Sequence, residues 1–179
     1  MTTITLTTKI YASKQIVFDA SRNISIHMQS ASKTNEKAIA GITSGLINLN
    51  ETVTWRGKHF GFYLTHKSRI PLMNFYDYFV DEMEEGKFKS FRHEHIYEEE
   101  NGFTTMTDKL HYETPFGILG KLFDILFLKK HLTNFLLERN KVLKEVSEKH
   151  FLHPNFHNIV ISTKEKSSQV TPLPISQSL

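Results

Sequence analysis

The sequence predicts an α+β domain in which a curved antiparallel sheet is wrapped around one long C-terminal helix. Two short helical patterns follow the first strand pattern, five or six further strand patterns run from residue 37 to residue 112, and a long helical pattern covers residues 118–148. A sheet with one apolar face needs an element to cover it, and this last helix is the only large one available. We assign residues 1–149 to a single domain and residues 150–179, which are rich in Ser, Thr, Lys and Gln, to a flexible tail.

Composition excludes several classes of protein. The 22 Lys and Arg and 19 Asp and Glu residues are spread along the chain without a basic block, so no nucleic-acid partner is expected. Because the chain has no cysteine, it forms neither disulfides nor thiolate metal sites. The first twelve residues lack the charged and apolar segments of a signal peptide, and we therefore expect a cytoplasmic location.

The first part of the chain contains a strand, two helices and two further strands. Residues 3–11 alternate between apolar and polar side chains, as a half-buried strand does. Ser13 and Ser25 are candidate N-caps of the two short helices. After a predicted strand over residues 37–42, residues 51–56 alternate again, and this pattern places Glu51, Val53 and Trp55 on one face.

The next two strands are predicted at residues 62–70 and 75–83. Pro71 should end the first of them, because proline cannot donate to the hydrogen-bond ladder. The turn around Gly86 allows two registers. A two-residue loop pairs Glu84 with Lys87, whereas a three-residue loop pairs Phe79 with His93 and turns Phe79 inward. We favour the second register, because the burial of large apolar side chains outweighs exposed ion pairs.

The central feature is a β-hairpin over residues 88–112 that turns at Asn101-Gly102. Asn-Gly is the strongest short hairpin signal, since both central residues of a type I′ turn need positive φ. Glu100 and Phe103 flank this turn, and counting outward from them places eight side chains on one inward face in four opposite pairs: Tyr97 and Met106, His95 and Asp108, His93 and Leu110, and Phe91 and Tyr112. Two histidines and an aspartate therefore interrupt an otherwise apolar and aromatic face.

The C-terminal helix is predicted over residues 118–148, with Thr114 as its cap and a possible kink near Lys129 and Lys130. Its later part carries an apolar stripe that includes Phe135 and also contains Arg139. Its first part, residues 118–128, is apolar on nearly all sides but too short to span a bilayer. Burial beneath loops is the favoured account of this segment, and transient contact with a membrane surface is the alternative.

The chain resembles a known superfamily in two segments. These are GLINLNETVTWRGKHFG at residues 45–61 and the run from Phe79 to Asn140, whose most specific positions are Phe79, Asp81, Gly86, Phe88, His93, His95, Thr104, Met106, Asp108, Pro115 and Gly117. Together they resemble the START-like, Bet v 1-like superfamily, also called SRPBCC, and within it the polyketide cyclase/dehydrase-like group. The resemblance covers about residues 1–148 and implies a helix-grip fold with a deep apolar pocket. Because such relatives include carriers and cyclases, it does not fix an activity.

We predict a ligand site on the inward face of the sheet and on the helix that covers it. The candidate ligand-binding residues are Glu51, Val53, Trp55, Phe91, His93, His95, Tyr97, Met106, Asp108, Leu110, Tyr112, Phe135 and Arg139. The His95 and Asp108 pair has three interpretations: a structural pair, a polar patch that orients a ligand, or an acid/base pair. Arg139 either pairs with Glu51 or another carboxylate, binds a ligand, or extends to the helix edge.

No metal site or cofactor is predicted. His93 and His95 with a nearby carboxylate could hold a divalent ion, but no third histidine has a diagnostic spacing, and aromatic neighbours suit an organic ligand better.

The first functional hypothesis is that the protein binds or transports a hydrophobic small molecule, such as a lipid, isoprenoid or polyketide. The absence of a nucleophile motif, phosphate loop or cofactor fingerprint favours binding over catalysis. The alternatives are a polyketide cyclase or dehydratase that uses His95 and Asp108 as an acid/base pair, and an interaction module with a filled core. The oligomeric state is not determined by the sequence.

Overall fold

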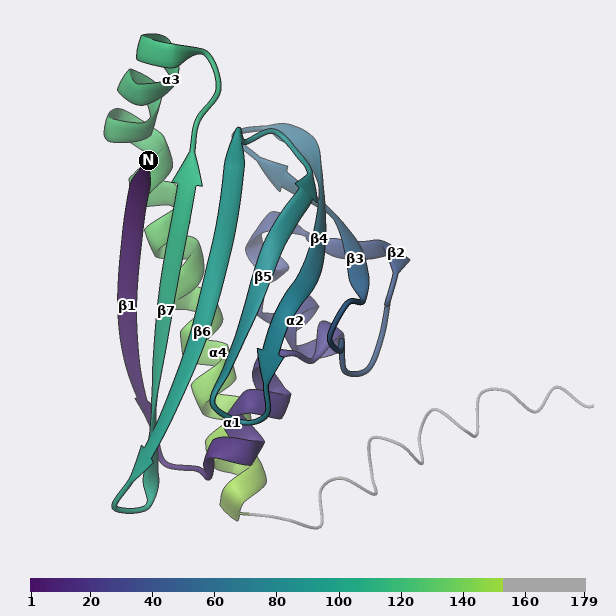
Figure 1. The fold of residues 1–179 in the computed structure, drawn as a ribbon, viewed down its shortest axis with the longest axis vertical. Helices are drawn as coiled ribbons and strands as arrows, with labels where there is room; N and C mark the ends of the chain where they lie inside the picture. The colour runs from purple at the N-terminus through teal and green to yellow at the C-terminus, as the bar shows by residue number, and fades with distance from the viewer. Residues whose placement is uncertain (153–179) are drawn as a thin grey trace, which may run out of the picture.

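The computed structural model describes residues 1–152, which form a seven-stranded antiparallel sheet curved around one long helix (Figure 1). The elements are, in chain order, β1 (Thr2–Ile10), α1 (Lys14–Ser21), α2 (Ile24–Ser30), the short turn η1 (Ser32–Thr34), β2 (Lys37–Gly41), β3 (Thr52–His59), β4 (Phe62–Asn74), β5 (Tyr78–Glu85), β6 (Ser90–Glu100), β7 (Phe103–Glu113), α3 (Gly117–Phe123), the π-helical turn η2 (Asp124–Leu128) and α4 (Lys129–Leu152). The strands lie in the order β1-β7-β6-β5-β4-β3-β2, so α1 and α2 connect the two edges of the sheet. This is the predicted α+β helix-grip architecture.

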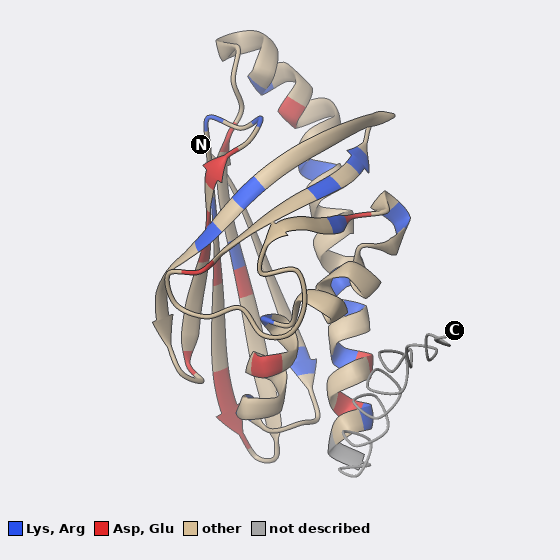
Figure 2. Ribbon diagram, turned by 90° about the vertical axis from the view of Figure 1, so that its right-hand side faces the viewer, with Lys and Arg blue, Asp and Glu red and all other residues tan. Residues whose placement is uncertain are grey.

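The interior lies between the sheet and α4, which packs against β1, α1 and α2. Figure 2 shows α4 running along one side of the curved sheet. Two buried apolar clusters fill much of this interior. The first includes Phe18, Trp55 and Met106, and the second includes Leu110 and Leu136. Met106 and Leu110 are inward positions of the same strand, so the residue between them on that face, Asp108, lies where the two clusters meet.

The central hairpin forms as predicted. Asn101 and Gly102 have φ values of 52° and 79°, which are the positive angles that a type I′ turn requires. The register pairs Tyr97 with Met106, His95 with Asp108 and Phe91 with Tyr112. The two histidines and the aspartate therefore face the interior.

The register around Gly86 differs from both predicted alternatives. Phe79 pairs with His95 and Asp81 pairs with His93, which is a shift of two residues from the favoured register. The strands turn over a longer connection because Phe88 folds inward onto Phe91 and Tyr112, with ring centroids 5.0 and 5.6 Å apart. Since a shift of two residues keeps each side chain on its face, Phe79 is nevertheless buried.

Three local predictions were wrong. β4 continues through Pro71, because the pairing with β5 shifts between Arg69 and Leu72 and this bulge removes the need for a proline N–H. Asn23, rather than Ser25, caps α2, with its side chain accepting hydrogen bonds from the N–H groups of residues 25 and 26. Phe116, rather than Thr114, precedes α3, and it does so in a left-handed conformation.

The C-terminal helix contains a π-helical turn near the predicted kink. This turn, η2, joins α3 to α4, and the backbone is right-handed helical at both junctions, Asp124 and Lys129. α4 continues to Leu152, three residues past the predicted domain boundary. The rest of the predicted tail, residues 153–179, lies outside the described residues.

Candidate functional site

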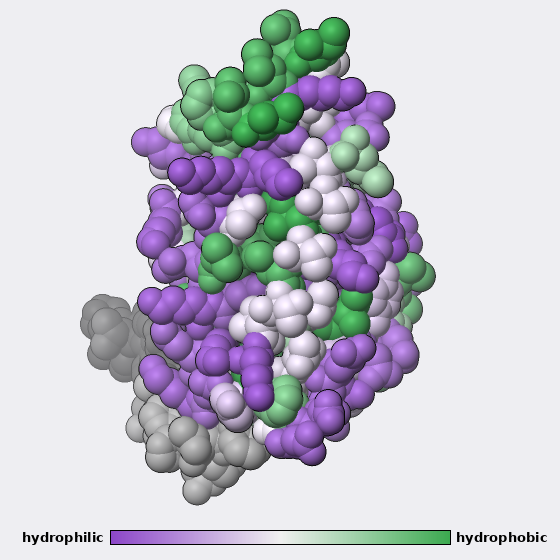
Figure 3. All heavy atoms as spheres, turned by 90° about the vertical axis from the view of Figure 1, so that its left-hand side faces the viewer, coloured by the Kyte–Doolittle hydropathy of each residue, from purple (hydrophilic) through white to green (hydrophobic). Residues whose placement is uncertain are grey.

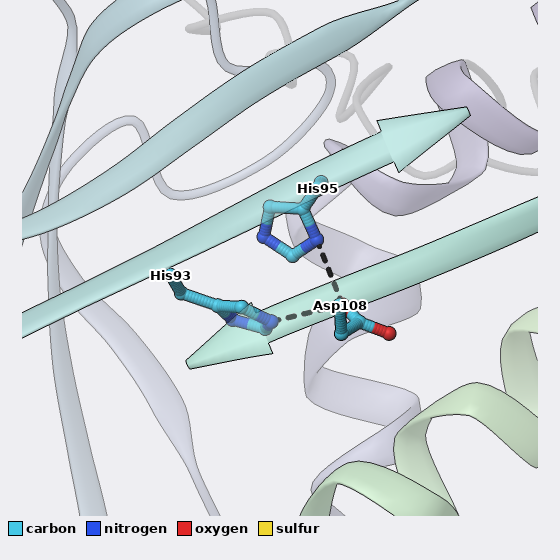
Figure 4. A group of neighbouring side chains, drawn as sticks. All are labelled: His93, His95 and Asp108. Carbon is cyan, nitrogen blue, oxygen red and sulfur yellow. Dashed lines mark hydrogen bonds and ion pairs between the residues drawn. The ribbon is translucent and has the colours of Figure 1, made fainter. Parts of the chain in front are cut away.

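The candidate site is built around the carboxylate of Asp108, which is fully buried on β7. His93 and His95 are two residues apart on β6, so their side chains share the inward face and both reach this carboxylate (Figure 4). His93 Nε2 lies 2.8 Å from Asp108 Oδ1, and His95 Nδ1 lies 3.0 Å from the same oxygen. The two imidazole rings are in contact, with centroids 3.9 Å apart.

The helix α4 supplies two further partners of Asp108. Asn140 Nδ2 donates a 2.7 Å hydrogen bond to Oδ2, and Arg139 Nη1 donates a 3.4 Å hydrogen bond to Oδ1. Arg139 also donates to the side-chain oxygen of Asn140 and to the backbone carbonyl of Ser21, at 3.2 and 3.5 Å. A single carboxylate therefore connects the sheet to the covering helix.

Protonation follows from this arrangement. Burial alone would raise the pKa of Asp108, but the hydrogen bond from His93, the nearby His95 nitrogen and the charge of Arg139 hold that pKa well below its usual value. Burial, together with the charge of His93, holds the pKa of His95 well below its usual value. At neutral pH the site thus contains an ionised Asp108, a charged Arg139 and a neutral His95.

The hydrogen bonding of His95 is incomplete. Although its Nδ1 lies 3.0 Å from Asp108, the contact is poorly aligned, and this nitrogen has no hydrogen-bond partner within the described residues. The ring stacks on Phe79, with centroids 4.2 Å apart. A buried imidazole without a full set of partners has capacity left for another polar group.

The donor set does not suit a metal ion. One nitrogen from each of His93 and His95 and one oxygen of Asp108 lie within 4.8 Å of one another. However, the Arg139 guanidinium is 3.4 Å from the same carboxylate oxygen, and both carboxylate oxygens already accept hydrogen bonds. A cation bound there would be repelled by the guanidinium and would have to displace these donors.

A cavity adjoins this polar cluster. It has a volume of about 180 Å³ and is lined by side chains from β3, β4, β6, β7 and α4. Eight of the predicted ligand-binding residues line it, namely Val53, Trp55, Phe91, His93, His95, Leu110, Phe135 and Arg139. The cavity is comparable in size to engineered apolar cavities of about 150 Å³ that bind benzene.

The other five predicted residues lie elsewhere. Asp108 is behind the histidines and Arg139, and Met106 and Tyr97 are packed in the first apolar cluster. Tyr112 donates a hydrogen bond from its hydroxyl to Asp124. Glu51 does not face Arg139: its carboxylate accepts a 2.7 Å hydrogen bond from the N–H of Asn48 in the turn before β3, because the strand begins one residue later than predicted.

The sequence interpretation missed the histidines of the opposite wall. His27, His59, His66 and His131 all line the cavity. His27 Nε2 lies 3.0 Å from Glu36 Oε2 and its ring stacks on Trp55, while His59 Nδ1 lies 3.0 Å from His131 Nε2. His66 pairs with Trp55 across β3 and β4, so the register of these strands would have indicated it. The others lie on elements whose approach depends on the tertiary fold.

A second hollow, of about 340 Å³, forms the mouth of the cavity. It shares Phe60, Leu64, Lys87, Phe88 and Leu128 with the cavity, so the two spaces lie side by side. Ligand pockets usually begin at roughly 300 Å³, a size that the inner cavity reaches only together with this mouth.

Two residues of the mouth have strained backbones. Among the described residues, positive φ outside glycine and asparagine occurs at Phe60 and Phe116, with values of 51° and 66°. Such angles are unusual for bulky side chains. At Phe60 the angle follows from the two-residue turn between β3 and β4, because Gly61 also has positive φ, as both central residues of a type I′ turn do. Both residues line the mouth.

Comparisons with known proteins agree on the fold. The Zhui aromatase/cyclase from Streptomyces sp. R1128 matches with a TM-score of 0.66 at 11% identity, over 83% of this chain and 94% of that one. A START superfamily protein from Mycobacterium smegmatis matches with a TM-score of 0.63 at 13% identity, over 82% and 97%. The ginseng major latex-like protein 151 from Panax ginseng matches with a TM-score of 0.61 at 14% identity, also over 82% and 97%.

No family model matches the sequence, and no curated protein matches it. The structural matches show the fold, and the site must therefore be argued from the geometry of this chain.

Replacing Asp108 with Asn should destabilise the protein strongly. The change leaves the Arg139 charge buried without its counter-charge, and breaking a buried ion pair in this way costs about 3–5 kcal/mol. Urea unfolding measures the loss. The matched control is the double variant D108N/R139M, which removes both charges and should recover part of the stability. Equal stability of D108N and the unchanged protein would contradict the proposed role of this carboxylate.

Stability should fall as the medium becomes acidic. Burial lowers the pKa of His59, His66, His95 and His131, so the folded chain takes up protons at lower pH than the unfolded chain. The unfolded chain protonates near pH ~6.5, and the free energy of unfolding therefore decreases as pH falls below that value. Thermal unfolding measured at pH values above and below ~6.5 shows whether stability falls or rises on acidification. His131→Asn should make the loss of stability with falling pH shallower. Stability that rises on acidification would contradict the lowered pKa values of these histidines.

Proposed function

We propose that this chain, which has the helix-grip fold of START-like and Bet v 1-like proteins, binds a hydrophobic small molecule with one polar end. The apolar body would occupy the cavity and its mouth, and the polar end would reach His95 and Arg139. The observation that carries the proposal is an apolar cavity that ends at a buried polar cluster with unused hydrogen-bonding capacity.

The walls supply the affinity in this proposal. Val53, Leu110 and Leu136 are buried side chains of the cavity, and Trp55 and Phe135 add aromatic surface. Each square ångström of apolar ligand surface removed from water contributes about 25 cal/mol. A ligand of this kind needs few directional contacts, which is typical of sites for lipids and other apolar molecules.

The polar cluster restricts the ligand head group. Asp108 already balances the charge of Arg139, and His95 is neutral, so neither of these two donors brings an unbalanced positive charge that would favour an anion. It offers hydrogen-bond donors from a guanidinium and an imidazole. A neutral acceptor such as a ketone, ester or hydroxyl oxygen fits these groups better than a carboxylate. Lipids, isoprenoids and polyketides all include such molecules.

A cyclase or dehydratase is the second candidate. The neutral His95 beside an ionised Asp108 has the arrangement of a carboxylate-oriented imidazole, which can transfer a proton. The likeness to an aromatase/cyclase concerns the fold alone. Turnover of a supplied poly-β-ketone by the purified chain would favour this candidate over passive binding. An interaction module with a filled core is the weakest reading, because about 180 Å³ beneath α4 is not filled by side chains.

Filling the cavity should abolish binding. Leu136 is buried and lines the cavity, whereas its neighbour Leu137 is 51% exposed. We expect Leu136→Trp to weaken the binding of a neutral apolar dye such as Nile red by about tenfold or more, because the indole takes the space of the ligand. Fluorescence titration measures the affinity. Leu137→Trp is the matched control and should bind like the unchanged protein. Dye binding that survives Leu136→Trp, or that is absent from both proteins, would contradict a ligand in this cavity.

A further inference from the structure

The segment formed by α3 and η2 exposes an apolar surface at one end of the molecule. It lies beyond the end of the sheet, and a continuous hydrophobic cap marks it at the top of Figure 3. Ile118 is 85% exposed and Ile125 is 75% exposed. The other large exposed side chains of the segment are Leu119, Leu122, Phe123, Leu126 and Phe127. We call this surface the apolar cap. The sequence-based expectation that loops bury residues 118–128 is therefore wrong.

The inner side of this segment is anchored to the rest of the fold. Asp124 accepts hydrogen bonds from the hydroxyl groups of Tyr112 on β7 and Thr2 on β1. Gly120 passes so close to the carbonyl of Pro115 that a Cβ atom would lie 1.9 Å from it. The Phe123 ring packs on Phe60, with centroids 5.2 Å apart. The apolar cap is thus the outer face of an element that is fixed to the sheet, and exposed patches of this kind mark interaction sites.

The exposed charges of the segment itself have one sign. Within residues 116–130, all of which the structure describes, the exposed charged side chains are Lys121, Lys129 and Lys130. The acidic residue of the segment, Asp124, is buried by its hydrogen bonds to the sheet. An apolar face bordered by lysines is complementary to a surface that is apolar inside and anionic outside, which describes a lipid bilayer with acidic head groups. A second copy of this chain would instead bring lysines against lysines.

The cap also adjoins the mouth of the cavity. Phe116, Leu119 and Phe123 line the mouth from the side of α3, and Phe60 lines it from the β3–β4 turn. The same short helix therefore contributes both to the outer apolar surface and to the entrance. Residues 117–128 would extend about 18 Å as a helix, which is too short to cross a bilayer and suited to lying in its interface. Within the described residues, no helix is long and apolar enough to span a membrane.

We propose that the apolar cap docks this protein on an anionic lipid bilayer, with the mouth of the cavity against the membrane. The biological purpose of docking depends on the proposed function, because a ligand dissolved in the bilayer would then enter the cavity without crossing water. The surface itself is defined by α3 and η2 and does not depend on the identity of the ligand.

Vesicle sedimentation tests the docking. The full chain should sediment with vesicles of equal parts phosphatidylcholine and phosphatidylserine, and binding should decrease with added salt, because salt screens the lysines. Ile118→Ser/Ile125→Ser should weaken binding by about tenfold or more, since both side chains face outward and are absent from the walls of the mouth. Lys121→Glu/Lys129→Glu should remove the preference for phosphatidylserine over phosphatidylcholine alone.

The control variant is Leu49→Ser/Leu72→Ser, which removes two exposed leucines outside the segment of α3 and η2 and should sediment like the unchanged protein. Failure of the unchanged protein to sediment would overturn the docking proposal, as would a dimer that dissociates in Ile118→Ser/Ile125→Ser without any vesicle binding. Nile red titration without vesicles separates the two proposals: a protein that binds the dye but not vesicles refutes docking alone, and one that binds vesicles but not the dye refutes the cavity ligand alone.

Discussion

The buried carboxylate of Asp108 is the interaction on which the rest of the structure depends. It accepts from His93 on the sheet and from Arg139 and Asn140 on α4, so one ionised group fixes the helix above the curved strands. Such a group is expensive to bury, and it is tolerated here because donors surround it and keep its pKa low. Because Asp108 stands on β7 and its partners come from β6 and α4, the position of the helix relative to the sheet is specified by polar contacts as well as by packing.

This constraint explains why space remains between sheet and helix. Asp108 lies between Met106 and Leu110, each of which belongs to a different apolar cluster, and the polar side chains around it prevent the two clusters from merging. The cavity adjoins this interruption and has Trp55 and Phe135 in its walls, and the mouth lies next to it at Phe60. The cluster around Asp108 supplies polar groups to one part of the space, whereas the adjoining mouth is largely apolar. An amphiphilic ligand would match this arrangement, and a membrane would present such a ligand at the mouth.

Most of the fold could be predicted from the sequence, because its strongest signals are local. Asn101-Gly102 fixes a turn and thereby the register of β6 and β7, which brings His93, His95 and Asp108 to one face. The register at Gly86 was wrong because it depends on Phe88 packing onto rings from other strands. The partner of Arg139 and the cavity-lining position of His131 could not be predicted either, since both depend on how α4 crosses the sheet. The exposure of Ile118 and Ile125 was missed for a related reason: an apolar sequence suggests burial, and only the fold reveals that none of residues 1–152 covers this surface.

The most direct test of the account is a crystal structure of the protein with a long-chain ketone that carries bromine at the end of its chain. The account predicts an anomalous bromine peak toward the mouth beside Phe60, with the ketone oxygen within hydrogen-bond distance of Arg139 or His95. A ligand bound only on the outer surface, with side chains filling the space under α4, would contradict it.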